Sequence, residues 1–265
     1  MSEQNFTIQT SNLSIGYKTK SETITIAQNI NLGLKKGKLI ALIGENGIGK
    51  STLLNMIAGL DSQTKGNIIL NNKEITGPGP ERAVVFQNHS LLPWLTVYQN
   101  IEMAVKKVMP QLSSQELRQR VEHFVSLVNL DHAKDKFPAG ISGGMKQRVG
   151  IARALSIKPD VLLMDEPFGA LDSLTRANLQ EHLMKIQESV QNTVIIITHD
   201  IDEAVLLSDR VIMMTNGPEA TIGEILEVNL PRPRDRVALQ SDKEYIRCRE
   251  AILDFLYKKF AKDHE

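Results

Sequence analysis

Apolar and polar residues alternate in short runs along the first third of the chain. Every second position is apolar in three stretches, which is the pattern of a half-buried strand: "FTIQT", "LSIGYK" and "ITIAQNINLGL". The next stretch, "KLIALIG", is apolar without interruption over the length of a strand, and this predicts a strand buried on both faces. Two more strands are predicted, one in "GNIILNNKEI" and one at residues 83–86.

The spacing of apolar residues becomes helical from about residue 88 to residue 159. Three helices are predicted there, the second with Ser113 or Ser114 as its N-cap: "VYQNIEMAVKKV", "SSQELRQRVEHFVSLVNL" and "SGGMKQRVGIARALSI". Beyond residue 160, strand-length apolar runs alternate with helical stretches: "DVLLMDEP", "LTRANLQEHLMKIQESV", "TVIIITHD", "DEAVLLSD", "RVIMMTNG" and "TIGEILEVNL". Strands that alternate with helices form parallel crossovers, so the pattern predicts an α/β core with a helical insertion.

The end of the chain predicts a polar corner followed by one more helix. "PRPRDR" places Arg232 and Arg234 beside prolines, which favours a turn at the surface. The last helix, "KEYIRCREAILDFLYKKF", carries apolar residues at helical spacing, and we expect this face to pack on the chain itself: Tyr245, Cys248, Ile252, Leu256 and Phe260.

Composition narrows the class of protein. A length of 265 residues fits one domain with a sizeable insertion, and 42% hydrophobic residues can form a full core. The formal net charge is zero, which argues against bulk binding to nucleic acid. A single cysteine excludes an internal disulfide. The N-terminal segment has no signal-peptide pattern and the chain has no long apolar run, so we expect a cytoplasmic location.

A glycine-rich loop follows the buried strand and precedes a helix. Gly44, four residues, then Gly49, Lys50 and Ser51 match the phosphate-binding pattern G-x-x-x-x-G-K-[ST]. The glycines let successive backbone N–H groups turn inward, and the helix N-terminus adds partial positive charge. Lys50 can then reach the β- and γ-phosphates, Ser51 can coordinate Mg²⁺, and Thr52 lies at the position of the α-phosphate. The loop alone leaves GTPases, kinases and other P-loop folds open.

Two carboxylates end the strand "VLLMDE". Asp165 and Glu166 would lie at the carboxyl edge of the sheet, where open α/β folds bind ligands. Asp165 suits Mg²⁺, directly or through water, and Glu166 suits the attacking water as a base or orienting group. The alternative is that both acids only favour the N-terminus of a following helix.

A second glycine-rich turn, Ser142-Gly143-Gly144, precedes another long helix, although one nucleotide does not need two such turns from one chain. With "QR" and "ARAL" following it, this turn resembles the signature motif of the ATP-binding subunits of ABC transporters, and the resemblance covers nearly the whole chain. In that family the signature of one subunit closes over the γ-phosphate held by the loop of another. Ile141 and Met145 depart from the commonest form, which has Leu and Gln, and we expect no loss of activity from them.

The resemblance implies a P-loop (RecA-like) ATPase core with an N-terminal antiparallel β subdomain and a helical insertion. The implied core spans 1–87 and 160–230, the helical subdomain 88–159, and a helical tail 231–265. The implied ATP and Mg²⁺ site takes its loop from Gly44, Glu45, Asn46, Gly47, Ile48, Gly49, Lys50, Ser51 and Thr52.

Further site residues are implied position by position. Tyr17 resembles the aromatic residue that stacks on adenine, although a tyrosine at a strand end can equally be a core residue. Gln87 resembles the glutamine that contacts Mg²⁺ or water. Asp172, in "GALD", resembles a residue of the loop that crosses the dimer interface. His199 resembles the switch histidine at the γ-phosphate, although a histidine at a strand end is often only a satisfied polar residue.

Several stretches look most like ATPase subunits of nitrate/nitrite importers; similar subunits serve bicarbonate, and related ones taurine and aliphatic sulfonates. The resemblance implies a second ATPase subunit, identical or paralogous, and transmembrane permease subunits at the cytoplasmic face of the membrane. A periplasmic or lipid-anchored solute-binding protein would be an indirect partner. We expect "SLLPWLTV", with Trp94, to be the permease-docking groove; the alternative is a core segment of the helical insertion. Two alternative hypotheses remain. One is a soluble ABC ATPase without a transport role, and the other is a regulator that binds nucleotide without hydrolysis.

Overall fold

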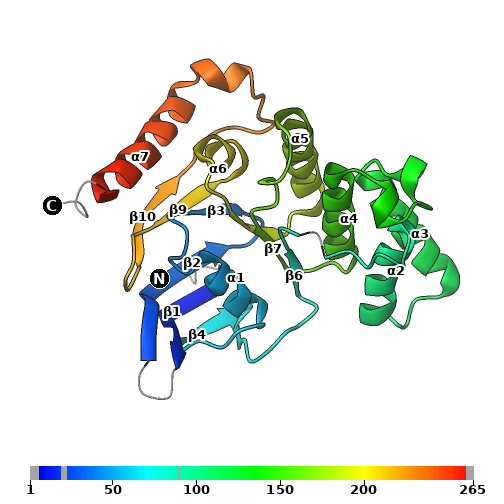
Figure 1. Ribbon diagram of the computed structural model, residues 1–265, viewed down its shortest axis with the longest axis horizontal. Coiled ribbons are helices and arrows are strands. Elements are labelled where there is room, and N and C mark those ends of the chain that lie inside the picture. The colour runs from blue at the N-terminus through cyan, green and yellow to red at the C-terminus, as the bar shows by residue number, and fades with distance from the viewer. Residues whose placement is uncertain (1–5, 19–22, 89, 261–265) are drawn as a thin grey trace. The chain divides into compact units, whose positions relative to one another are not determined.

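The computed structural model describes residues 6–18, 23–88 and 90–260 (Figure 1). Contacts divide the chain into two compact units. The first unit combines residues 1–79 with residues 193–265, and the second spans residues 80–192. The subdomain boundaries implied by the resemblance, at 87/88 and 159/160, stay a prediction.

An antiparallel sheet forms one layer of the first unit, with strand order β2-β1-β4-β5. Its strands are β1 (Phe6–Lys18), β2 (Thr23–Lys35), β4 (Lys65–Leu70) and β5 (Lys73–Glu74). The alternating pattern explains the pairing, because one set of alternate side chains forms a buried face that includes Ile8, Ile15 and Ile30. The two stretches predicted as separate strands, "FTIQT" and "LSIGYK", are one continuous strand, β1.

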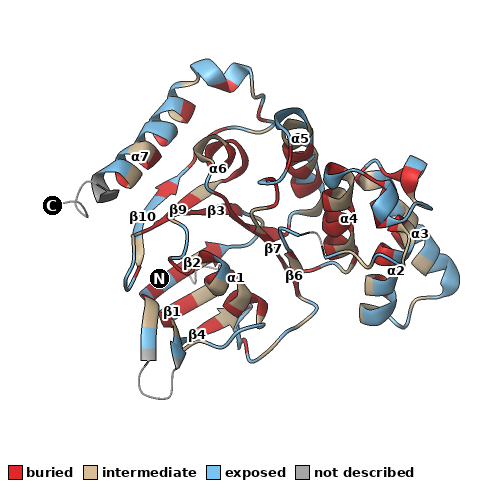
Figure 2. Ribbon diagram, viewed as in Figure 1, coloured by how far each residue is buried: buried red, intermediate tan, exposed pale blue. Residues whose placement is uncertain are grey.

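The parallel strands of the first unit surround β3 (Leu39–Ile43), which pairs with β8 (Thr193–Ile197) on one side and β9 (Arg210–Met214) on the other. The last strand, β10 (Ile222–Glu227), runs antiparallel to β9. Every residue of β3 and β8 is buried (Figure 2), so the prediction from the uninterrupted apolar run is confirmed. The helices of this unit are α1 (Lys50–Ala58), α6 (Ile201–Leu207), α7 (Lys243–Phe260) and a short 3₁₀ helix at Ala238–Ser241.

In the second unit, as far as its residues are described, two parallel strands, β6 (Arg82–Val85) and β7 (Val161–Asp165), are accompanied by four helices. The helices are α2 (Val97–Val108), α3 (Ser114–Leu127), α4 (Gly143–Ser156) and α5 (Ser173–Val190), with 3₁₀ turns at Asp131–Ala133 and Pro138–Gly140. Ser113 is the N-cap of α3, and with Glu116 it forms a capping box that fixes where the helix begins.

Two expectations about the C-terminal segment have different outcomes. The prediction of a surface corner is wrong for Arg234. Its side chain is buried, because it donates hydrogen bonds to carbonyls at the end of α6. The packing face of α7 is confirmed for Tyr245, Cys248 and Ile252, which are buried. Leu256 is only half-buried, and the side chain of Phe260 lies outside the described residues. Among the described residues, the structure has no helix both long and apolar enough to cross a bilayer.

Candidate functional site

The glycine-rich loop connects β3 to α1 and encloses the ammonium group of Lys50. Gly47 and Gly49 have φ angles of 85° and 97°, a left-handed backbone that favours glycine. Lys50 is only 5% exposed, and its Nζ donates to the carbonyl oxygens of Gly44, at 2.8 Å, and Glu45. Gly49 is the N-cap of α1 and offers no side-chain cap to the first-turn N–H groups. A cation and helix-start N–H groups therefore gather at one loop, which suits a phosphate.

The β1–β2 hairpin packs against this loop. A Cβ at Gly49 would lie 3.2 Å from Cγ2 of Ile26 in β2 and 3.8 Å from side-chain carbons of Ile15 in β1. Tyr17 lies two positions beyond Ile15 and is 59% exposed, so it is not a core tyrosine. Within the loop, Asn46, Gly47 and Ser51 are exposed, Glu45 and Thr52 are half-buried, and Ile48 is buried.

His199 and the loop lie at the same edge of the parallel sheet. Leu42 of β3 is opposite Ile197 of β8. The loop begins at Gly44, two residues after Leu42, and His199 lies two residues after Ile197. The histidine is exposed, and the turn that follows it is held by a bond from the Asp200 N–H to the Thr198 hydroxyl at 3.0 Å. Residues distant in sequence thus lie at the same carboxyl edge, where open α/β sheets bind ligands.

The second unit repeats this arrangement with β6 and β7. Val85 is opposite Met164, and Gln87 and Glu166 each lie two residues after the paired residue of their own strand. The Gln87 amide Nε2 is 3.5 Å from the Glu166 carboxylate Oε2. Glu166 has a φ angle of 43°, a left-handed backbone that is costly for a non-glycine residue and that clusters at functional sites. Asp165 is the last residue of β7.

The two glycines of the Ser142-Gly143-Gly144 turn have different environments. Ser142 is the N-cap of α4, and its hydroxyl accepts from the Met145 N–H at 3.3 Å. Gly143 is exposed, and a Cβ there would meet only Leu171 at 3.8 Å. Gly144 is buried, and a Cβ there would lie 2.3 Å from Cγ2 of Thr175. The first glycine leaves room outside the helix, whereas the second permits α4 to pack on α5.

Asp172 is the N-cap of α5 and is exposed. Its Oδ1 accepts from the Thr175 N–H at 3.0 Å. This bond, together with one from the Thr175 side chain, holds the pKa of Asp172 below its usual value. Leu174 next to it is 75% exposed, so the start of α5 presents an acidic and an apolar side chain outward.

The comparison with known proteins decides the family. The family model described as "ABC transporter" matches residues 27–169. The nitrate transport protein NasD of Klebsiella oxytoca is 57% identical over 256 residues, which cover 96% of this chain and 98% of that protein. This chain belongs to the ABC transporter family, as an ATP-binding protein.

Two further comparisons agree with this assignment. The bicarbonate transport ATP-binding protein CmpD of Synechococcus elongatus is 51% identical over 96% of this chain and 91% of that protein. The dimeric ATP-binding cassette MJ0796, bound to ADP and Pi in a post-hydrolysis state, superposes with a TM-score of 0.72 at 31% identity, over 84% of this chain and all of that one. The ABC chain is an ATPase with the P-loop fold of that family, as the resemblance implied.

Trp94 is 67% exposed in this ABC chain, which contradicts the alternative that it belongs to an internal core. Asn100 of α2, fully buried, holds the segment that carries it. The Asn100 Nδ2 donates to the carbonyls of Leu92, Leu95 and Thr96 at 2.9–3.2 Å, and its Oδ1 accepts from the Leu92 N–H at 2.9 Å. Sequence reasoning missed Asn100, since the only signal was a polar residue beside the apolar face of a helix.

The oxygen donors available for a metal are few. No group of three or more His, Cys, Asp and Glu side chains gathers among the described residues as a metal site would. In the first unit Ser51 is an exposed hydroxyl residue of the phosphate-binding loop, and in the second unit Gln87 is exposed and Asp165 is a half-buried carboxylate at the end of β7. Each is an oxygen donor of the kind that Mg²⁺ accepts, together with waters and substrate phosphates.

Proposed function

We propose that this ABC ATPase hydrolyses MgATP in a head-to-tail dimer and powers an importer of a small inorganic anion, nitrate or nitrite. The observation that supports the proposal is that the phosphate-binding loop and His199 follow the same carboxyl edge of the neighbouring strands β3 and β8. In the second unit, Gln87 and Glu166 likewise follow the carboxyl ends of the paired strands β6 and β7, and the Gln87 amide lies 3.5 Å from the Glu166 carboxylate.

Phosphate binding falls to the loop between β3 and α1. Backbone N–H groups of the loop and the start of α1 would donate to the phosphate oxygens, with Thr52 at the α-phosphate. Lys50 would redirect its ammonium from the loop carbonyls to the β- and γ-phosphates, a short movement because the side chain already lies inside the loop. The exposed ring of Tyr17 would stack on the adenine.

Hydrolysis requires a water in line with the bond to the leaving ADP. Glu166 would orient this water and take its proton as the water oxygen bonds to the γ-phosphorus and the bond to the ADP oxygen breaks. His199 would donate a hydrogen bond to the γ-phosphate. When bound through Ser51, Gln87 and Asp165, Mg²⁺ would neutralise phosphate charge.

The second half of the site would come from another ATPase chain, identical or paralogous. Ser142, Gly143 and Gly144 would close over the γ-phosphate bound to the partner, and Asp172 would line the interface. The exposed backbone at Gly143 supports this, because a phosphate can approach there without meeting a side chain. The exposed Leu174 beside Asp172 and the dimeric state of MJ0796 support it as well.

Glu166→Gln tests this function. The amide cannot accept the proton from water, so turnover should fall by about 10²-fold or more while ATP binding remains. The purified variant should accumulate as a nucleotide-loaded dimer under saturating MgATP, measured by size-exclusion chromatography with light scattering. Glu188→Gln makes the same chemical change on the exposed side of α5 and should behave as wild type. A Glu166→Gln chain that stays monomeric, or still turns over, refutes the proposed site.

The transport partners would be permease subunits at the cytoplasmic face of the membrane, and a periplasmic or lipid-anchored solute-binding protein would act only through them. The exposed Trp94, on a segment fixed by Asn100, supports a docking surface there. An importer subunit has no need of nucleic acid, which agrees with zero net charge.

The cargo rests on likeness to the relatives. The 57% identity to the nitrate transport protein NasD over nearly all of both chains favours nitrate. Bicarbonate is the alternative, since CmpD is 51% identical; taurine and aliphatic sulfonates follow. Uptake of labelled nitrate, bicarbonate and taurine by a deletion strain, complemented with the wild type or with Glu166→Gln, separates them. Loss of bicarbonate uptake alone would overturn the nitrate assignment and leave the ATPase proposal intact.

A further inference from the structure

Helix α6 begins two residues after His199, so this histidine lies in the short connection between β8 and α6. Thr198 and Asp200 flank the histidine and bond each other. The Asp200 carboxylate also accepts from the Glu203 N–H at 3.0 Å, which caps the start of α6. The strand, the histidine and the helix therefore form one continuous support.

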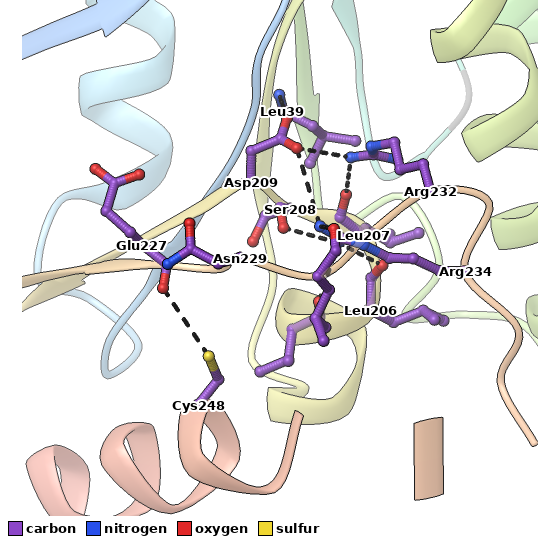
Figure 3. A network of polar contacts seen from close by, with 12 residues as sticks. Leu39, Leu206, Leu207, Ser208, Asp209, Glu227, Asn229, Arg232, Arg234 and Cys248 are labelled. Atoms are coloured by element: carbon purple, nitrogen blue, oxygen red, sulfur yellow. Dashed lines mark hydrogen bonds and ion pairs between the residues drawn. The ribbon is translucent and has the colours of Figure 1, made fainter. Parts of the chain in front are cut away.

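The C-terminal end of α6 is held by two arginines that come later in the chain (Figure 3). Arg234, only 7% exposed, donates through Nη1 to the carbonyls of Val205, Leu206 and Ser208 at 2.8–3.2 Å. Arg232 donates through Nη2 to the Leu207 carbonyl at 3.0 Å. Carbonyls at a helix C-terminus lack partners within the helix and attract positive charge. Here four consecutive carbonyls, 205 to 208, all accept from these two guanidinium groups.

The same cluster reaches the strand that leads to the phosphate-binding loop. Asp209 accepts from Arg232 at 3.2 Å through Oδ1, and from the backbone N–H of Leu39 at 2.9 Å through Oδ2. Leu39 is the first residue of β3. Burial, with the nearby Arg232 charge, lowers the pKa of Arg234 to about 10, so the guanidinium is charged at neutral pH.

The N-terminal turn of α6 is held by α7. The Tyr245 hydroxyl donates to Oδ1 of Asp202 at 3.0 Å, and Nε of Arg249 donates to the same oxygen at 2.6 Å. Tyr245 belongs to the buried face of α7, together with Cys248, Ile252 and Phe255. The segment from residue 230 to residue 249 therefore bonds α6 at both ends.

We propose that Arg234 and Tyr245 are positioning residues for His199, and that the C-terminal segment sets the place of this histidine by holding α6 at both ends. The inference rests on the proposed function, because it assumes that His199 acts at the γ-phosphate. A purely structural role would predict lost stability with no specific change at the histidine.

Tyr245→Phe and Arg234→Lys test the inference in the purified full chain. The first removes one hydroxyl and keeps the ring in its packed place. The second keeps the charge but loses the planar fork that serves several carbonyls. Tyr257→Phe, on the 71% exposed ring of the same helix, and Arg118→Lys, on an exposed arginine of α3, are the matched controls. His199→Ala is measured in parallel and assigns the His199 signal in spectra of histidine-labelled protein.

We expect kcat to fall by about ten-fold in both test variants, as a misplaced group at the reacting centre predicts, with KM for ATP little changed. The His199 resonance should shift in the test variants and stay in place in the controls. Unchanged kcat with an unmoved His199 resonance overturns the inference, even if the unfolding temperature falls. If Arg234→Lys fails to fold, Tyr245→Phe carries the test.

The His199→Ala result separates this inference from the function on which it rests. If this variant keeps the wild-type kcat, the proposed role of His199 is wrong, and the resonance shift alone decides whether the C-terminal segment positions the residue. If turnover is lost in His199→Ala and normal in Tyr245→Phe and Arg234→Lys with an unmoved resonance, the proposed function stands and the positioning role is refuted.

Discussion

The pair Gly144 and Thr175 allows a quantitative test of how the signature turn is built. In Gly144→Ala the new methyl carbon would lie 2.3 Å from Cγ2 of Thr175, whereas ordinary carbon–carbon contacts are about 3.5–4.0 Å. Relief requires a shift of more than 1 Å or a rotated threonine, and overpacking of this kind costs about 1–3 kcal/mol. Alanine in a helix recovers up to about 1 kcal/mol relative to glycine. With that gain in full, the net loss should be about 0–2 kcal/mol, and Gly144→Ala should be about 1–3 kcal/mol less stable than a Gly→Ala change without a clash.

Thr175→Ser removes the clashing methyl and keeps the hydroxyl beside Asp172. Alone it should cost at most about 0.8 kcal/mol, the value of one fully buried methylene group, because Thr175 is only half-buried. In the double variant the clash is gone, so the two changes should couple by about 1–3 kcal/mol, the energy of the clash, in the stabilising direction. Gly143→Ala is the control, because its Cβ meets only Leu171 at 3.8 Å. It should leave stability unchanged or slightly raised.

Urea unfolding followed by circular dichroism measures all four free energies. Thermal midpoints provide a check, since 1 kcal/mol corresponds to about 2–4 °C for a chain of this size. The reasoning is refuted if Gly144→Ala is as stable as Gly143→Ala, or if Thr175→Ser recovers nothing. ATPase activity should show the reverse order: Gly143→Ala should lose turnover without losing stability, because its methyl group would occupy the space proposed for the partner's phosphate.

Three further outcomes are expected. Trp94→Ala should change the free energy of unfolding by no more than about 0.5 kcal/mol, because the side chain is exposed, and should weaken co-purification with the permease subunits. Undiminished co-purification would exclude docking at this surface. Asn100→Ala should lower the free energy of unfolding by about 2–3 kcal/mol, because it leaves backbone groups of the 92–96 segment without partners. It should also lower the fluorescence anisotropy of Trp94, the single tryptophan. An unchanged anisotropy would mean that Asn100 does not hold this segment. Burial and the bond to Asp202 raise the pKa of Tyr245 from 10.0 to about 12. The folded chain therefore keeps the hydroxyl proton to a higher pH than the unfolded chain does. The stability that results is fully present below pH 10 and is lost as the pH rises through about 12. Stability curves of Tyr245→Phe and wild type should therefore converge at high pH, and parallel curves would contradict the shift.

The sequence was sufficient for elements with a strong local pattern. The uninterrupted apolar run at β3 and the helical spacing of α2, α3 and α4 each predicted the element that the structure contains. The alternation of strands and helices also predicted parallel strands, and the pairs β3 with β8 and β6 with β7 are parallel. These predictions succeed because an element that is buried on one or two faces has apolar residues at a regular spacing in the sequence.

The contacts that the sequence left unpredicted join distant residues. Arg234 was expected at the surface because it lies in a proline-rich, polar stretch, yet it bonds the carbonyls of Val205, Leu206 and Ser208, and backbone carbonyls carry no sequence signal. The distinct roles of Gly143 and Gly144 depend on Thr175 of another helix. The left-handed backbone of Glu166 also follows from its surroundings, since its residue type does not favour that conformation.

The pairing of β3 has a consequence for synthesis on the ribosome. Both of its neighbours, β8 and β9, lie beyond residue 192. A nascent chain therefore carries a fully apolar strand with two unpaired edges until most of the protein has been made, and such edges invite association with other chains. Early termination should consequently yield aggregates with no residual nucleotide binding, and chaperone demand should be highest while the middle of the chain is being translated.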